Sequence, residues 1–204
     1  NHSCALDDNH TVMCWGASDN GERGDGTIAT TETPKLVIVP MPPMPTPPPL
    51  MGVEHITTFR DFTCAITPGA TATCWGLGNS GEMGDGTYSG RSAPGAAVKL
   101  SGVTLLAAGS EHACALANGG LACWGASYHG EAGPFGRGGY ERGNLPAMVP
   151  LAGPAAIELA GGDEHTCALL ADHTVTCWGD GRAGQLGNGV HDRRVHVAPR
   201  LPCP

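Results

Sequence analysis

The sequence predicts an all-β fold in which a unit of about four short antiparallel strands is repeated four times. The tripeptide Cys-Trp-Gly occurs four times; each copy is preceded by a second Cys, and its Gly begins the motif Gly-x4-Gly-[Glu/Gln]-x-Gly. The leading cysteines lie 50 to 60 residues apart, a period typical of propeller blades or solenoid turns. They are Cys4, Cys64, Cys114 and Cys167, and the tripeptides begin at Cys14, Cys74, Cys123 and Cys177.

The composition agrees with short strands joined by turns. The 204 residues include 32 Gly and 17 Pro. Long helices are not expected, because an interior Gly costs about 1 kcal/mol relative to Ala and an interior Pro about 3 kcal/mol. The formal charge of −8 disfavours a nucleic-acid partner, which requires a basic face. No apolar run approaches the ~18 residues that a membrane helix needs, so no membrane insertion is expected.

Each segment between two paired cysteines predicts a β-hairpin. Side chains alternate along a strand, so pairing Cys167 with Cys177 places Leu169 opposite Val175 on the same face. The other three copies give equivalent apolar pairs. The third copy is one residue shorter, and its loop, residues 118–119, is the Asn-Gly pair of a two-residue turn.

The remaining three hairpin loops have three residues each. Their middle residues are Asn9, Gly69 and Asp172, which tolerate a left-handed backbone.

Further short runs complete each repeat. Apolar runs precede three of the hairpins at residues 53–58, 103–108 and 155–160, and runs near proline follow the Gly-rich stretches at residues 97–100 and 147–151. About four strands per repeat with Gly-rich turns favour a β-propeller blade over a helical solenoid.

A proline-rich tract, residues 40–50, lengthens the first repeat. Such a tract favours polyproline II and cannot donate hydrogen bonds to a sheet. We interpret it as a rigid surface loop between strands. Its PxxP spacing leaves a second interpretation open, a ligand for an aromatic groove.

One domain is expected over residues 1–204, as a single propeller segment. The repeats run approximately over residues 1–60, 61–110, 111–163 and 164–204.

The fourth repeat carries a family resemblance. It reads Glu-His-Thr-Cys-Ala-Leu from Glu164, His-Thr-Val-Thr-Cys-Trp-Gly from His173 and Gly-Gln-Leu-Gly-Asn-Gly from Gly184. This pattern resembles the repeat of the regulator of chromosome condensation family, over essentially the whole chain. The resemblance implies a β-propeller of four-stranded blades, usually seven, and the paired cysteines are similar to those of secreted bacterial members.

Two departures from the family pattern affect single turns. Residues 59–62, Phe-Arg-Asp-Phe, stand where other copies have Gly-x-x-His, and residues 133–136, Gly-Pro-Phe-Gly, replace Gly-x-Gly. Among the family's roles, a secreted member that binds and inhibits β-lactamases implies a binding platform. The nucleotide-exchange role of the nuclear member does not suit an acidic chain with paired cysteines.

The cysteines predict four disulfides. Counted outward from the loop, each Cys pair is the fourth cross-strand pair, and in the third copy it is a non-hydrogen-bonded pair. The Cα atoms of such a pair are ~4.5 Å apart, which a disulfide accepts. The predicted bridges are Cys4–Cys14, Cys64–Cys74, Cys114–Cys123 and Cys167–Cys177.

Paired cysteines imply an oxidising compartment, hence a secreted or cell-surface protein. Two other uses of the sulfurs stay open: reduced buried thiols, and a zinc site that includes His2, His112 or His165, which share a face with the neighbouring Cys. No metal or other cofactor is expected.

Other apparent motifs belong to the repeat. Residues 76–81 match the dinucleotide pattern Gly-x-Gly-x-x-Gly, but no helix follows to hold a pyrophosphate. No arrangement of catalytic groups stands out, and the chain is not expected to be an enzyme.

The favoured function is a non-enzymatic extracellular protein-binding scaffold that recognises its partner through inter-blade loops that vary between copies. The alternative is a propeller-based hydrolase or lyase with its site at the central opening. Aromatic and Arg residues are usual interface anchors, and they collect in these loops together with histidines. The candidate contacts are Tyr88, Arg91, Tyr128, His129, Phe135, Arg137, Tyr140, Arg142, His191, Arg193 and Arg194.

The last expectation is whether the four repeats close into a ring. The first copy has no run equivalent to residues 103–108, so three full blades and one incomplete blade are expected in an open partial propeller cut from a longer chain. Cys203, the ninth cysteine, would then pair with the absent part or remain a free thiol. A closed four-bladed ring is the alternative.

Overall fold

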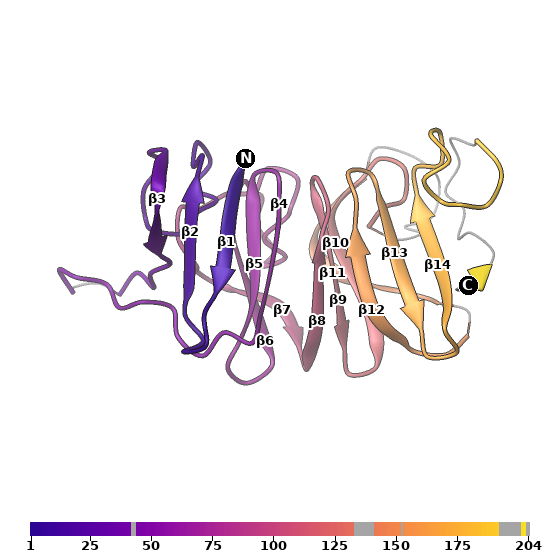
Figure 1. Ribbon diagram of the computed structural model, residues 1–204, viewed down its shortest axis with the longest axis horizontal. Coiled ribbons are helices and arrows are strands. Elements are labelled where there is room, and N and C mark those ends of the chain that lie inside the picture. The colour runs from indigo at the N-terminus through magenta and orange to yellow at the C-terminus, as the bar shows by residue number, and fades with distance from the viewer. Residues whose placement is uncertain (42–43, 133–140, 152, 192–200, 203–204) are drawn as a thin grey trace.

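Four antiparallel β-sheets stand side by side along the long axis of the protein in the computed structural model (Figure 1). The structure describes residues 1–41, 44–132, 141–151, 153–191 and 201–202, with only the backbone of residues 141, 201 and 202. The first sheet has three strands and the other three have four, in sequence order across each sheet. The all-β prediction of repeated antiparallel blades is confirmed.

We number the sheets as blades 1 to 4. Blade 1 contains β1 (His2–Leu6), β2 (Val12–Gly16) and β3 (Thr31–Leu36). Blade 2 contains β4 (His55–Phe59), β5 (Phe62–Thr67), β6 (Thr71–Gly76) and β7 (Ala97–Ser101). Blade 3 contains β8 (Val103–Ala108), β9 (His112–Ala117), β10 (Gly120–Ser127) and β11 (Glu141–Val149). Blade 4 contains β12 (Ala156–Gly161), β13 (His165–Leu170), β14 (Thr174–Gly179) and β15 (Leu201–Pro202).

The hairpin register agrees with the prediction. Cys167 lies opposite Cys177 and Leu169 opposite Val175. All four cysteine pairs face each other across their hairpins, with Cα atoms 4.0–4.1 Å apart and sulfur atoms at disulfide distance. These eight cysteines therefore form disulfides rather than reduced thiols or a zinc site. Cys203 lies outside the described residues.

The last residue of each three-residue loop has a left-handed backbone. The positive φ angles fall on His10 (59°), Ala70 (53°) and His173 (61°), and among the middle residues only Gly69 (83°) has one. The reason is visible in the last loop, where the Asp172 carboxylate accepts the N–H of Thr174 two residues on. Asp172 thus builds the turn with its side chain, and the next residue takes the left-handed backbone.

Neighbouring blades pack in one repeated way, with the disulfide face of each blade against the Trp face of the next. Cys64 and Cys74 of blade 2 share a core with Trp124 of blade 3, and Cys114 and Cys123 of blade 3 share one with Trp178 of blade 4. The Cys4–Cys14 pair and Trp75 join blades 1 and 2 likewise. Each Trp indole thereby fills the space beside the preceding disulfide.

A hydrogen bond fixes each buried indole. Trp75 Nε1 donates to the backbone carbonyl of Glu22 at 2.9 Å, Trp124 Nε1 to that of Glu82 at 2.8 Å, and Trp178 Nε1 to that of Glu131 at 3.0 Å. The motif Gly-[Glu/Gln]-x-Gly thus supplies an acceptor for the next blade.

The last glycine of this motif makes room for the indole. A Cβ on Gly24 would lie 2.5 Å from Trp75 Nε1, and one on Gly84 would lie 2.8 Å from Trp124 Nε1. Both glycines also have positive φ angles. A side chain at either position would therefore push the indole of the next blade away.

A second polar contact crosses two of the three blade junctions. His2 Nε2 lies 2.7 Å from Thr63 Oγ1, and His112 Nε2 lies 2.8 Å from Thr166 Oγ1. At the middle junction both partners are apolar, because Phe62 takes the histidine position and Ala113 the threonine position. The departure at Phe62 is thus matched on the other side of the junction, and no buried hydroxyl is left there without its histidine.

The four blades form an open arc, as predicted. The strand β1 packs against β4, β4 against β8, and β8 against β12. Blades 1 and 4 lie at opposite ends of the molecule (Figure 1). A closed four-bladed ring would instead pack blade 4 against blade 1, so that alternative is wrong.

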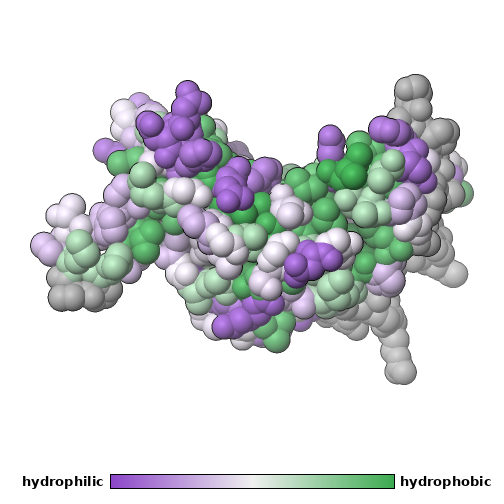
Figure 2. Space-filling view, turned by 90° about the horizontal axis from the view of Figure 1, so that it is seen from below, coloured by the Kyte–Doolittle hydropathy of each residue, from purple (hydrophilic) through white to green (hydrophobic). Residues whose placement is uncertain are grey.

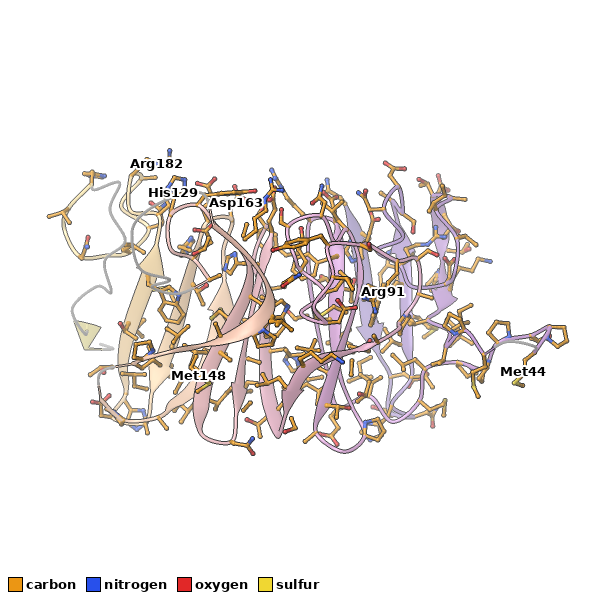
Figure 3. All side chains as sticks on the ribbon, turned by 180° about the vertical axis from the view of Figure 1, so that it is seen from behind. Met44, Arg91, His129, Met148, Asp163 and Arg182 are labelled. Atoms are coloured by element: carbon orange, nitrogen blue, oxygen red, sulfur yellow. A yellow bond between two sulfur atoms is a disulfide. The ribbon has the colours of Figure 1, made fainter. Side chains whose placement is uncertain are left out.

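The proline-rich tract forms a projection from blade 1. Its base is held by two backbone hydrogen bonds, from Val39 N to Pro48 O at 2.9 Å and from Leu50 N to Val37 O at 2.8 Å. Val37 and Leu50 are buried, whereas Met44 is 51% exposed and lies near the tip, far from the sheets (Figure 3).

No helix among the described residues is long and apolar enough to cross a membrane.

Candidate functional site

One end of the arc gathers, in blades 2 to 4, the turns between the first and second strands and the long loops between the third and fourth strands. In the three-stranded blade 1, the loop between β2 and β3 lies at this end. We call this end the loop surface; its described loops are residues 17–30, 60–61, 77–96, 109–111, 128–132, 162–164 and 180–191. His129, Asp163 and Arg182 stand along this edge in Figure 3. The loops of the four hairpins that carry the cysteine pairs lie at the opposite end.

Three of the candidate contacts meet at the boundary of blades 2 and 3. The guanidinium of Arg142 lies 5.9 Å from the ring centroid of Tyr128, and its Nε donates to the Tyr128 hydroxyl at 3.2 Å. The Tyr88 hydroxyl donates to the backbone carbonyl of Arg142 at 3.1 Å, although Tyr88 is distant in sequence. Both Tyr88 and Arg142 are exposed, so this aromatic and cationic cluster is open to a partner.

A second group spans blades 3 and 4. Arg182 NH2 lies 2.7 Å from Glu164 Oε2 and 3.2 Å from His129 Nε2, and His129 lies 3.5 Å from the same carboxylate. His191 Nδ1 lies 3.2 Å from the backbone carbonyl of Arg182. Hydrogen bonds to Asp180 and Glu164 raise the pKa of Arg182, so its charge is fixed at physiological pH.

An acidic depression of about 450 Å³ separates these two groups. Glu111 connects it to the first group, because its Oε2 accepts hydrogen bonds from Ser80 Oγ at 2.8 Å and Tyr128 OH at 3.1 Å. Four carboxylates face one guanidinium here, which favours a partner that presents a positive group. The depression is lined by Arg60, Ser110, Glu111, Tyr128, Glu131, Asp163 and Glu164.

Sequence reasoning missed most of this depression. Asp61, Glu111 and Glu164 occupy the same repeat position, directly before Phe62, His112 and His165. That recurrence of an acidic residue was a signal that could have been found.

Arg91 belongs to the 77–96 loop, and its guanidinium is held within that loop. Its guanidinium forms an ion pair with the buried Asp85 and donates to the carbonyl of Ala96 at 3.2 Å. Figure 3 shows Arg91 on the flank, well below His129 and Asp163. Arg91 thus closes its own loop, as Arg23 does with Asp25 in blade 1, and its role as a contact residue stays a prediction.

The description of the candidate loops as inter-blade is wrong. Residues 77–96 join β6 to β7, residues 128–140 join β10 to β11, and residues 180–200 join β14 to β15, and each pair of strands belongs to one sheet. The loops lie within blades because the run near proline after each loop is the outer strand of the same blade. Phe135, Arg137, Tyr140, Arg193 and Arg194 lie outside the described residues.

Two buried glutamates in this region have structural contacts. Burial raises the pKa of Glu82 to about 7 and also raises the pKa of Glu131. Glu82 Oε2 accepts the N–H of Ser80 at 2.8 Å, and Glu131 accepts the N–H groups of Tyr128 and His129. Each glutamate therefore closes its own loop, while its backbone carbonyl receives the next blade's Trp.

Two of the three histidines considered for zinc have other contacts. His2 and His112 contact threonines of the following blades, and burial lowers the pKa of His112 to about 3. No group of three or more His, Cys, Asp or Glu side chains among the described residues is placed to hold a metal ion.

The opposite end carries a groove of about 530 Å³ between blades 3 and 4, lined by aliphatic residues, Pro and Gly. Leu116, Leu121, Met148 and Leu151 contribute to its walls. Figure 2, which views the molecule from below, shows apolar side chains interspersed with polar ones across this end. The residue types that line this groove therefore differ from the charged residues that line the depression on the loop surface.

Comparison with known proteins agrees with the repeat geometry. The model of the regulator of chromosome condensation (RCC1) repeat matches residues 1–22 and 156–185. The repeats of this chain match the regulator of chromosome condensation repeat in sequence and in fold. It is 29% identical to the human E3 ubiquitin-protein ligase HERC2 over 98% of its length, and 29% identical to the ultraviolet-B receptor UVR8 of Arabidopsis thaliana over 97%.

Solved structures of the repeat family share the fold. The yeast RCC1 protein Prp20, in a crystal structure with Kap60 bound, matches 100% of this chain with a TM-score of 0.78 and 21% identity. The chain spans less than half of these relatives: 4% of HERC2, 43% of UVR8 and 47% of the yeast chain.

Proposed function

We propose that this chain is a non-enzymatic extracellular scaffold that binds a protein partner through its loop surface. The observation that carries the proposal is the convergence of Tyr88, Tyr128 and Arg142, which come from separate loops and strands and contact one another in the open. Tyr and Arg are the residues most often found at the energetic centre of protein interfaces. A relative seen with Kap60 bound supports protein binding as the class of function.

The acidic depression beside this cluster sets the partner's chemistry. Glu111, Asp163 and Glu164 line it, and the chain as a whole is acidic. A partner that presents Lys or Arg opposite the depression gains complementary charge and a faster association rate. Such binding weakens as the salt concentration rises.

The experiment is capture of partners from the fluid around the source cells by the tagged chain, with mass spectrometry of what is retained. The double variant Tyr128→Ala/Arg142→Ala is expected to weaken retention at least about tenfold. The matched control is Met148→Ala, because Met148 is 64% exposed and lies at the opposite end. Loss of the partner with Met148→Ala but not with the double variant would place recognition elsewhere.

The extracellular location rests on the four cysteine pairs. They lie at disulfide distance in all four hairpins, and such bonds persist in oxidising compartments. Non-reducing peptide mapping of protein isolated from its source is expected to show all four bridges. Eight free thiols there would contradict the proposed location while leaving the binding proposal to be tested separately.

A further inference from the structure

The cysteine hairpins of blades 1 and 4 have nearly the same loop sequence. Blade 1 has Asn-His-Thr at residues 9–11, and blade 4 has Asp-His-Thr at residues 172–174. In both loops the His has a left-handed backbone, with φ of 59° at His10 and 61° at His173. The two loops therefore allow Asn9 and Asp172 to be compared directly.

The Asp172 side chain is part of its turn, whereas that of Asn9 is not. Asp172 Oδ1 accepts the N–H of Thr174 at 3.2 Å and the Thr174 hydroxyl at 2.6 Å. In blade 1, Asp7 accepts both groups instead: the N–H of Thr11 at 2.8 Å and its hydroxyl at 2.7 Å. The Asn9 carboxamide thus makes no hydrogen bond within the described part of the chain.

Asn9 is exposed, and the same loop position is exposed in blades that have all four strands. In blade 2 the position is Gly69, where an added Cβ would meet nothing within 4 Å, and in blade 4 it is the exposed Asp172. Both blades include their first strand, so the exposure of this position does not depend on the strand that blade 1 lacks. A group attached to Asn9 would extend into solvent.

This loop lies far from the proposed binding surface. It joins β1 to β2 at the bottom of the view in Figure 1, whereas the N-terminus stands at the top. Tyr128 and Arg142 belong to the loop surface at the other end. A bulky group at Asn9 therefore leaves the loop surface accessible to a partner.

The sequence around Asn9 is that of an acceptor for an N-linked glycan. Asn-x-Ser or Asn-x-Thr, with x other than Pro, accepts such glycans on surface loops of secreted proteins. Residues 9–11 satisfy this pattern, and Asp172 removes it from the otherwise identical tripeptide of blade 4. The transfer requires an Asn side-chain amide, which Asn9 presents without a competing contact.

A second acceptor sequence, Asn-His-Ser at residues 1–3, is less suitable. The backbone carbonyl of Asn1 accepts the N–H of Ala17 at 3.0 Å, which places Asn1 beside the start of the loop at residues 17–30. A glycan on Asn1 would therefore stand at the loop surface and obstruct the proposed binding.

We propose that Asn9 carries an N-linked glycan. The proposal rests on the extracellular location proposed above, because the chain meets the donor on the secretory route. Asn9 Nδ2 forms a bond to C1 of the first sugar of a lipid-diphosphate-linked oligosaccharide, and the bond between C1 and the phosphate oxygen breaks. The lipid diphosphate leaves with the electron pair of that bond, and the amide nitrogen gives up one proton.

The timing of the transfer follows from the contacts of Thr11. The transferase must reach both Asn9 and the Thr11 hydroxyl, which Asp7 holds in the folded hairpin. We therefore expect transfer to the newly made chain, before the Cys4–Cys14 bridge closes the hairpin.

The test is mass spectrometry of peptides from the protein isolated from its source, before and after treatment with a peptide N-glycanase. This enzyme removes the glycan and converts the acceptor Asn to Asp. The peptide that contains Asn9 is expected to lose the mass of the glycan and to show Asp at position 9. A bare Asn9 in this sample would overturn the proposal.

Disulfide mapping of the same sample separates this proposal from that of the location. Four bridges together with a bare Asn9 would overturn the glycan and leave the location standing. Eight free thiols together with a bare Asn9 would overturn both. The binding proposal is tested separately, by Tyr128→Ala/Arg142→Ala.

Variants of the whole chain, secreted from cultured eukaryotic cells, assign the site. Asn9→Gln and Thr11→Ala are each expected to lose the glycan completely, whereas Thr11→Ser is expected to keep it, because a hydroxyl remains at the third position. Asn9→Gln is expected to form all four bridges, since the Asn9 side chain makes no hydrogen bond in the hairpin. A glycan that persists in Asn9→Gln, or one found on Asn1 in place of Asn9, would contradict the assignment.

The matched control is Asp172→Asn, which gives blade 4 the tripeptide of blade 1. This variant is expected to carry a second glycan, which shows that the cells modify the tripeptide in this kind of loop. Modification of Asn9 alone also supports the proposal, because the side chain at position 172 is occupied by Thr174. Modification at position 172 without modification of Asn9 would overturn it.

Discussion

The inner and outer blades contain the same repeated residues and bury them to different extents. Cys64 and Cys114 in blades 2 and 3 are fully buried, whereas Cys167 in blade 4 is partly exposed. Trp75 and Trp124 are fully buried, whereas Trp15 is partly exposed. The sheets themselves are alike, so the neighbouring blade decides whether a repeat residue forms core, as expected of a quasi-one-dimensional repeat protein.

The largest expected difference between the two regions is at the Trp positions. Trp124→Ala removes a buried indole and leaves the Glu82 carbonyl without its donor, so it is expected to cost about 3–5 kcal/mol of unfolding free energy. Trp15→Ala is expected to cost less than about 1 kcal/mol in the monomer. Urea unfolding of both variants at low protein concentration measures the comparison, and equal costs would contradict it.

Two disulfides, one in an inner blade and one in an outer blade, allow the same comparison with a smaller expected effect on the unfolding free energy. The hairpins closed by Cys114–Cys123 and Cys167–Cys177 have nearly equal sequence separations, 9 and 10, so constraint of the unfolded chain contributes about equally to both. Replacing the Cys114–Cys123 pair by alanines is expected to cost about 2–4 kcal/mol, and replacing the Cys167–Cys177 pair less, because the latter is less buried.

Reductant accessibility sharpens this comparison without any substitution. Because Cys167 is partly exposed, limited reduction followed by alkylation is expected to label the blade 4 pair before those of blades 2 and 3. Mass spectrometry gives the order of labelling. Earlier labelling of Cys64 or Cys114 would show that burial does not govern reduction here.

The junction between blades 3 and 4 supplies a pH-dependent prediction. Burial lowers the pKa of His112 from 6.5 to about 3, so the folded protein holds this ring neutral. Stability from this residue is therefore present above pH 6.5 and is lost progressively as the pH falls from 6.5 towards 3. The double variant His112→Phe/Thr166→Ala, which copies Phe62 and Ala113, is expected to remove this dependence.

The single variants complete the cycle. Thr166→Ala leaves the buried His112 Nε2 without its partner and is expected to cost about 1–2 kcal/mol at pH 7, more than the double variant. Denaturation curves at pH 7 and pH 5 for the four proteins measure the coupling. A double variant less stable than either single would contradict the pairing.

The smallest expected effect concerns Glu82, at the [Glu/Gln] position of the Gly-[Glu/Gln]-x-Gly motif. Burial raises the pKa of Glu82 to about 7, so the folded state binds its proton more tightly than the unfolded state, and this residue's contribution to stability is lost as the pH rises from about 4.5 through 7. Glu82→Gln keeps the acceptor for Ser80, as Gln185 does for Ala183 in blade 4. It is expected to stabilise the protein by about 1 kcal/mol at pH 8 and to have little effect at pH 4. Thermal unfolding at both pH values measures this change.

Much of the local structure was predictable because it depends on near neighbours in sequence. Alternation along a strand and the length of each loop placed Leu169 opposite Val175 and each Cys opposite its partner. The left-handed residue was not predictable in the same way. Asp172 can build a turn either with its backbone or with its side chain, and only the observed bond to Thr174 distinguishes the two.

The candidate site was predictable in part. The loop residues were identified by type, but their grouping depends on contacts across long stretches of chain, such as that of Tyr88 with Arg142. The sequence does not distinguish an Arg that pairs with a buried carboxylate from an Arg that is free to contact a partner. Arg91 is an example, because its pairing with the buried Asp85 is visible only in the structure.

By itself, then, the sequence of this protein determined its strands, register, disulfide pairs and open arc, because hydrogen-bonded hairpins and a repeated motif are local or periodic properties. The tertiary structure alone decided what each repeat residue does. Trp178 is core where blade 3 supplies the Glu131 carbonyl to its indole, and His112 is buried where blade 4 supplies the hydroxyl of Thr166. These outcomes depend on the neighbouring blade, whose side chains set burial, dielectric and hydrogen-bond partners together.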